Sequence, residues 1–171
     1  METIPLEKSQ PGWFRYLANV HFGWFWLIFF LAQLMVAFPP LLFDFLPEGA
    51  LENTAVDMLR ARGKTMVLYS TVIFAPIIET FICQFSVIKL FRLMTKRFDL
   101  TLFIAVPLSA FLFAIGHWFS IYYVVAMFLA GILLALAFVV GMYRRDLPAF
   151  LNVAIIHASW NLFAFVAEEV F

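Results

Sequence analysis

The chain has 171 residues, of which 65% are apolar, 13% are charged and 23 are phenylalanine. A soluble domain is closer to half apolar and one quarter charged, so this surplus of apolar side chains cannot be buried in a single core. The 11 basic and 11 acidic residues leave no net charge, which argues against a nucleic-acid partner. The composition therefore predicts an integral membrane protein.

Five stretches of the chain are long and apolar enough to span a bilayer, which takes about 20 residues for roughly 30 Å of hydrocarbon. Backbone groups in lipid must bond within their own segment, so we expect helices. The expected spans are Val20 to Leu42, Thr65 to Phe91, Leu100 to Trp118, Tyr122 to Met142 and Ala149 to Ala167. The predicted fold is an all-α transmembrane bundle of about five spans, with residues 1–171 in a single membrane domain.

The loops between these spans differ in their content of lysine and arginine, and an excess of these residues marks the cytoplasmic side. The N-terminal side holds Lys8, Arg15, Lys89, Arg92, Lys96, Arg97, Arg144 and Arg145, against Arg60, Arg62 and Lys64 on the other side. We therefore expect a multi-pass protein of the cell (inner, cytoplasmic) membrane with its N-terminus in the cytoplasm. The largest polar stretch precedes the second span, and its residues from Ala50 to Arg62 are expected to form a connecting helix along the surface.

A few polar side chains interrupt the apolar spans: Glu79, Gln84, His117, His157 and Asn161. Ionisable groups at membrane depth are costly unless they face a protein interior or water, so each is a candidate for a functional site. At 1.5 Å of helix per residue, the carboxylate, the two imidazoles and the Asn161 amide fall within about 10 Å of one another in depth. We expect these four groups to meet.

Three short motifs carry these residues. The stretch "APIIETFICQ" contains Glu79, "FAIGH" runs from Phe113 to His117, and "HASWN" runs from His157 to Asn161. The ends of the second and third motifs are four residues apart, so each pair shares one face of a helix. Each motif alone is weak, whereas all three in order on successive apolar helices form a fairly specific pattern.

In their order and approximate separation, the motifs resemble those of the CPBP family of intramembrane glutamic endopeptidases. This family includes CAAX prenyl proteases and the bacteriocin-processing and abortive-infection types. Its motifs are Glu-Glu-x-x-x-Arg after Ala-Pro, then Phe-x-x-x-His, then His-x-x-x-Asn or Asp. The resemblance covers Phe74 to Phe165, which is the expected catalytic core. The chain departs from it at Thr80 and Gln84, where the family has its second glutamate and its arginine.

The resemblance implies an intramembrane endopeptidase that hydrolyses a peptide bond of a membrane-embedded or lipidated substrate within the bilayer. Glu79 would act as general base on a water that His117 helps to hold, and His157 and Asn161 would stabilise the oxyanion. Two histidines and a glutamate also match a catalytic zinc set. There is no His-Glu-x-x-His sequence, however, and the ligands would come from three helices, so we expect a metal-independent reaction without a cofactor.

Other interpretations of the same residues remain open. Glu79 pairing with His117 or His157 would also fix the packing of helices. The neutral residues at Thr80 and Gln84 are compatible with a catalytically inactive immunity or scaffold protein that binds a membrane peptide. A proton-coupled transporter is disfavoured, because the chain shows no internal repeat.

Overall fold

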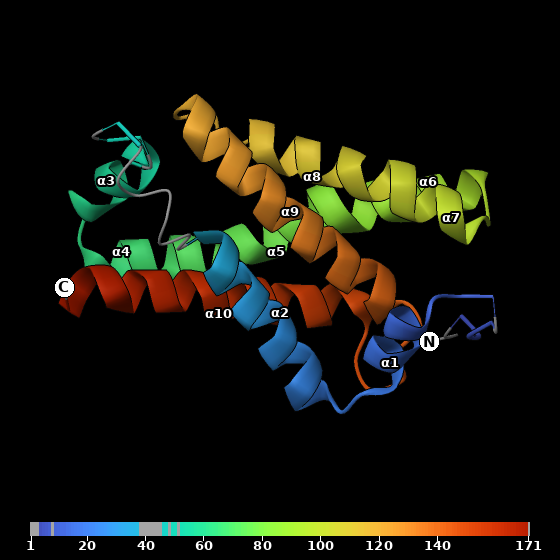
Figure 1. Cartoon of the computed structure of the whole chain (residues 1–171). Helices are drawn as coiled ribbons and strands as arrows, with labels where there is room; N and C mark the ends of the chain where they lie inside the picture. Colours follow the sequence, from blue (N-terminus) through green and yellow to red (C-terminus); the bar gives the residue numbers. More distant parts are fainter. Residues whose placement is uncertain (1–3, 8, 38–45, 48, 51, 171) are drawn as a thin grey trace.

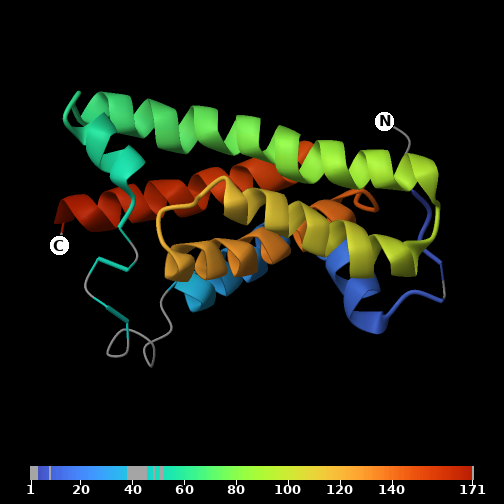
Figure 2. The same ribbon diagram turned by 90° about the horizontal axis from the view of Figure 1, so that it is seen from above.

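The part of the chain that the computed structural model describes, residues 4–7, 9–37, 46–47, 49–50 and 52–170, contains helices and no strand. Four of these helices are long and apolar enough to cross a membrane, and Figures 1 and 2 show them packed along one another. They run over Lys64–Met94, Phe98–Ile115, Ile121–Gly141 and Ala149–Glu168. The ends lie within three residues of the last four expected spans. The predicted all-α bundle is confirmed, and the protein is a multi-pass membrane protein.

Two of the four spans combine α-helical with π-helical segments. The span Lys64–Met94 consists of α4 (Lys64–Val67), η2 (Leu68–Phe74), α5 (Ala75–Glu79), η3 (Thr80–Ser86) and α6 (Val87–Met94). The span Phe98–Ile115 consists of α7 (Phe98–Leu100), η4 (Thr101–Ala105) and α8 (Val106–Ile115). In each case a proline follows the π segment near the start of the next α segment. π-Helical turns are rare and occur frequently at functional sites.

The other two spans are regular α-helices, α9 (Ile121–Gly141) and α10 (Ala149–Val170). Ser120 begins α9 by accepting a hydrogen bond from the Tyr123 N–H at its side chain, which is the usual role of a serine before the first helical turn. This N-cap separates α8 from α9 in the uncharged stretch "HWFSIYY".

The expected first span is represented by α2 (Phe22–Ala37), which follows a short helix α1 (Gly12–Asn19). With 16 residues, α2 is about 24 Å long, shorter than the roughly 30 Å of a hydrocarbon core. Residues 38–42 of the expected span lie outside the described residues. That the chain crosses the membrane at this first position therefore stays a prediction. α2 itself is packed against α9 and α10.

α9 forms the centre of the bundle and contacts α2, α8 and α10. Its side chains Phe138, Val139 and Val140 are fully buried. α8 approaches it closely at Gly131, where a Cβ atom would lie 2.9 Å from the Ala110 Cα atom. Small residues of this kind let the backbones of membrane helices come close together, and the resulting dispersion contacts stabilise the pair.

The connections between helices gather at two ends of the bundle (Figures 1 and 2). The N-terminal residues lie at the end that carries the α6–α7 and α9–α10 connections. The short helix α3 (Thr54–Arg60) lies at the opposite end, with the α8–α9 turn and the C-terminal end of α10. Polar bonds tie this second end together, since Asn53 donates to Tyr123 Oη at 3.0 Å and Arg60 pairs with Glu168.

We predict that Gly131→Ala destabilises the protein by about 1–3 kcal/mol, because the added methyl group forces α8 away from α9. The thermal unfolding midpoint in detergent micelles measures this effect. Gly12→Ala is the matched control, since a Cβ at Gly12 has no neighbour within 4 Å. Equal losses of stability in the two variants would show that the α8–α9 contact is not closely packed.

Candidate active site

Glu79 is the last residue of α5, and its carboxylate faces two imidazoles from different parts of the chain. The Oε1 atom lies 3.9 Å from Nε2 of His117, in the turn after α8, and Oε2 lies 3.5 Å from Nε2 of His157 on α10. Both distances exceed that of a direct hydrogen bond. The three groups line a cavity of about 780 Å³ whose wall also includes Asn161. The structure thus brings together the four residues that we expected to meet, and it leaves out Gln84.

The orientation of the His117 ring is set by a backbone carbonyl of α8, the helix that precedes it. Its Nδ1 lies 2.8 Å from the carbonyl oxygen of Phe113, and because a carbonyl oxygen only accepts, Nδ1 must be the donor. His117 lies outside the spanning helices, and burial lowers the pKa of its imidazole. The ring is therefore neutral at neutral pH, and its Nε2 presents a lone pair toward Glu79.

His157 is the most deeply buried of the four candidate residues that line the cavity, with 4% of its surface exposed. The Phe113 ring packs against both imidazoles, at centroid distances of 4.6 Å from His117 and 5.6 Å from His157. Within the described residues, the Nδ1 atom of His157 has no hydrogen-bond partner. The first residue of the "FAIGH" motif is thus the apolar wall that keeps the two rings in place.

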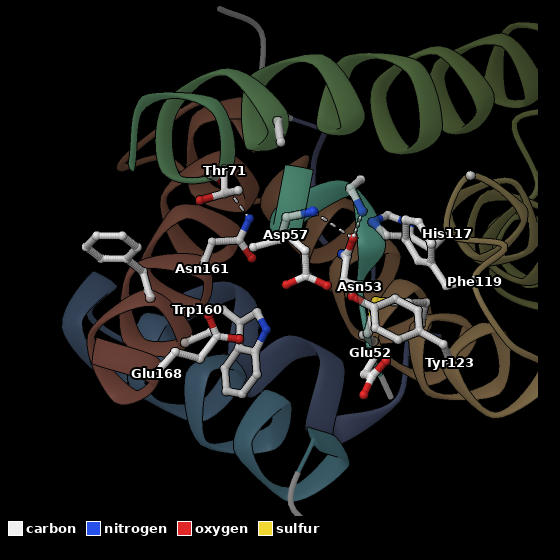
Figure 3. Close-up of a pocket in the computed structure, with 18 of the residues that line it drawn as sticks. Glu52, Asn53, Asp57, Thr71, His117, Phe119, Tyr123, Trp160, Asn161 and Glu168 are labelled. Carbon is white, nitrogen blue, oxygen red and sulfur yellow. Dashed lines mark hydrogen bonds between the residues drawn. The ribbon is translucent and has the colours of Figure 1, made fainter. Parts of the chain in front are cut away.

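Asn161 lies one turn after His157 on α10, and its amide is already engaged. The Nδ2 atom donates to the backbone carbonyl of Thr71 in η2 at 2.7 Å, as Figure 3 shows. An amide nitrogen carries two N–H groups, so this bond leaves one donor available to a ligand in the cavity. Sequence reasoning singled out Asn161 but not its partner, because the partner is a backbone atom.

Thr80 and Gln84, which occupy the positions of the family's second glutamate and arginine, are both fully buried in η3. Neither side chain bonds to any described residue, and neither lines the cavity. Two neutral groups without partners cost less than two separated charges in the same place. The structure therefore places the departure from the family pattern outside the cavity that holds Glu79. Cys83, also buried, likewise does not line it.

The far end of the cavity is lined by α3 and the residues just before it (Figure 3). α3 is shorter than the expected helix from Ala50 to Arg62, and instead of lying free along the surface it forms part of the cavity wall. Ser120 donates to the carbonyl of Ala50, and Arg60 pairs with Asp57 at 3.3 Å as well as with Glu168. These contacts fix the segment over the end of the cavity.

Gln33 is a lining residue that sequence reasoning missed. It is 3% exposed on α2, and its Nε2 donates to the carbonyl of Ala130 on α9 at 3.2 Å. A signal was present, since Gln33 is a polar residue inside the expected first span. Tyr123 and Asn53 also line the cavity, but a tyrosine at a span end and an asparagine in a loop are too common to stand out.

By residue type alone, two histidines and a glutamate match a catalytic zinc set. Among the side chains that the structure describes, however, no three His, Cys, Asp or Glu residues are grouped so as to hold a metal ion. Catalytic zinc sites need three protein ligands at about 2.0–2.2 Å from the ion. The carboxylate and the two imidazoles face one another across 3.9 and 3.5 Å on the wall of the cavity.

Comparison with known protein families gives a match that includes the candidate site. No curated protein and no solved structure is significantly similar to the chain. A family model described as "Type II CAAX prenyl endopeptidase Rce1-like" matches residues 61–163, which is more than half of the chain and includes all three motifs. This match confirms the resemblance noted from the motifs: the chain belongs to the Rce1-like family of type II CAAX prenyl endopeptidases.

Proposed function

We propose that the protein is an intramembrane endopeptidase in which Glu79 activates the attacking water without a metal ion. The observation that carries this proposal is the position of the Glu79 carboxylate, 3.9 Å from one imidazole nitrogen and 3.5 Å from another on the wall of a cavity of about 780 Å³. Membership of the endopeptidase family agrees with it. A carboxylate held away from bulk water is also a stronger base than one in water.

The attacking water binds between Glu79 and His117 in this proposal. A separation of 3.9 Å between Oε1 and Nε2 allows one water to lie within hydrogen-bonding distance of both atoms. Because the lone pair of Nε2 and the carboxylate both accept, the water directs its two hydrogens at them. Its oxygen lone pair then faces the substrate carbonyl, and Glu79 takes the proton as the bond to carbon forms.

His157 and Asn161 stabilise the oxyanion of the tetrahedral intermediate. His157 donates from Nε2, the nitrogen that faces the cavity, and Asn161 donates from the N–H that is not bonded to Thr71. Donors fixed in place before the reaction are the most effective kind, because they need no reorganisation as charge develops. Glu79 then returns its proton to the amine nitrogen as the oxyanion re-forms the carbonyl and the C–N bond breaks, which releases an amine and a carboxylate product.

The proposed substrate is a membrane-embedded or lipidated peptide or protein, as the family's CAAX prenyl substrates suggest. We also propose that the protein resides in the cell (inner, cytoplasmic) membrane with its N-terminus in the cytoplasm, as the distribution of basic residues indicates. In this orientation, the cavity end lined by α3 lies on the outer side of the membrane.

We predict that Glu79→Gln lowers the rate of peptide cleavage by about 10²–10⁴-fold, because the amide cannot accept the proton of the water. The measurement is cleavage of a farnesylated CAAX peptide by the purified protein in lipid vesicles. Thr80→Val is the control, since it removes a buried, unpaired hydroxyl from the neighbouring position, and we expect it to keep its activity. Undiminished cleavage by Glu79→Gln would refute the general-base role, whereas a wild-type protein that binds the peptide without cleaving it would favour the binding protein.

We further predict that His117→Asn loses more activity than His117→Gln. An asparagine amide reaches the Phe113 carbonyl but places no acceptor at the position of Nε2, whereas the longer glutamine carries its amide oxygen toward that position. The ratio of the two kcat values in the same vesicle assay checks this difference, with thermal unfolding as the control for folding. Equal kcat values in both variants would mean that the Nε2 lone pair has no part in the reaction.

A further inference from the structure

The carbonyl of Thr71 lies where the hydrogen-bond ladder of the span Lys64–Met94 is interrupted. In a π-helix each N–H bonds to the carbonyl five residues earlier, and the Ala75 N–H accordingly donates to the Ser70 carbonyl. Residue 76 would be the next donor in this pattern, but it is a proline and has no N–H. The Thr71 carbonyl is therefore left without its helical donor.

Asn161 supplies the donor that the helix lacks. Its Nδ2 lies 2.7 Å from the Thr71 carbonyl oxygen, and Figure 3 shows the bond joining two helices at the wall of the cavity. A carbonyl inside a membrane protein needs a donor from the protein, because lipid offers none. The bond satisfies this carbonyl and also holds the Asn161 amide in one orientation.

We propose that Pro76 is a positioning residue for Asn161. By leaving the Thr71 carbonyl free, Pro76 anchors one N–H of the Asn161 amide and so directs the other into the cavity that Glu79 lines. This inference rests on the proposed function, which assigns that second N–H to the oxyanion. Pro76 is buried three residues before Glu79. The proline that interrupts the helix thus couples the placement of the base to the placement of an oxyanion donor.

The span Phe98–Ile115 offers a matched control for the proline itself. The Val106 N–H there donates to the Thr101 carbonyl, again five residues earlier, and Pro107 follows directly. Pro107 thus interrupts the same pattern at a place that does not line the cavity. A substitution at Pro107 changes helix propensity in the same way as one at Pro76, but it leaves the Thr71 carbonyl and Asn161 as they are.

The first test is a stability cycle of Pro76→Ala and Asn161→Ala, read as thermal unfolding midpoints in micelles. Asn161→Ala leaves the Thr71 carbonyl without a donor, so we expect a decrease of about 5 °C in the wild-type background. In the Pro76→Ala background the backbone N–H regained at position 76 is available to that carbonyl, and the decrease should be less than half as large. In the Pro107→Ala background it should keep its full size. Alanine suits a helix interior better than proline, so both proline variants are expected to fold.

The second test measures kcat and KM of the same proteins on the farnesylated CAAX peptide in vesicles. We expect Asn161→Ala to lower kcat by about 10²-fold and Pro76→Ala to lower it by about tenfold with KM little changed, because the amide is less firmly held. The double variant should be no slower than Asn161→Ala alone, since both changes act on one donor. Pro107→Ala should retain the wild-type kcat.

The outcomes separate the two claims. Equal losses of stability in the wild-type and Pro76→Ala backgrounds, a fully active Pro76→Ala protein, or kcat losses that multiply in the double variant would each overturn the positioning role of Pro76. Full activity of Asn161→Ala would overturn the oxyanion role given to Asn161 in the proposed function, and the positioning role with it. In that case a coupled stability cycle would still establish that the Thr71 bond is purely structural.

Discussion

The carboxylate of Glu79 has to be accommodated in the middle of a helix that otherwise faces lipid and apolar side chains. An ionisable group at that depth is tolerated only where protein or water surrounds it. His117 and His157, approaching within 3.9 and 3.5 Å from two other parts of the chain, supply this environment. The close approach of α8 to α9 at Gly131 and the packing of α9 against α10 bring these imidazoles to the carboxylate. The packing around α9 therefore holds both imidazoles beside the Glu79 carboxylate.

Much of this arrangement was predictable from the sequence, because lipid imposes strong rules on composition. A span must be long and apolar, so four spans were located to within three residues. The same rule makes polar residues conspicuous, and Glu79, His117, His157 and Asn161 stood out because everything around them is apolar. Their similar expected depths were compatible with a common site, and the structure shows all four on the wall of one cavity.

The other features of the fold and of the site depend on contacts that a sequence pattern does not reveal. The Thr71 carbonyl is a backbone atom whose partner lies ninety residues away, and the π-helical segments around Glu79 have no clear compositional signature. α3 forms part of the cavity wall through polar bonds to α9 and α10, whereas its sequence resembles an ordinary connecting helix. Gln33 is different, since a polar residue in an apolar span was a usable signal.

We propose that Glu79 activates a water held by His117 inside the membrane without a metal ion. The most direct measurement is the cleavage rate of a farnesylated CAAX peptide by the purified protein in lipid vesicles, with and without an excess of the zinc chelator 1,10-phenanthroline. We expect cleavage at the same rate in both conditions. Activity that disappears with the chelator and returns with added zinc would contradict this proposal.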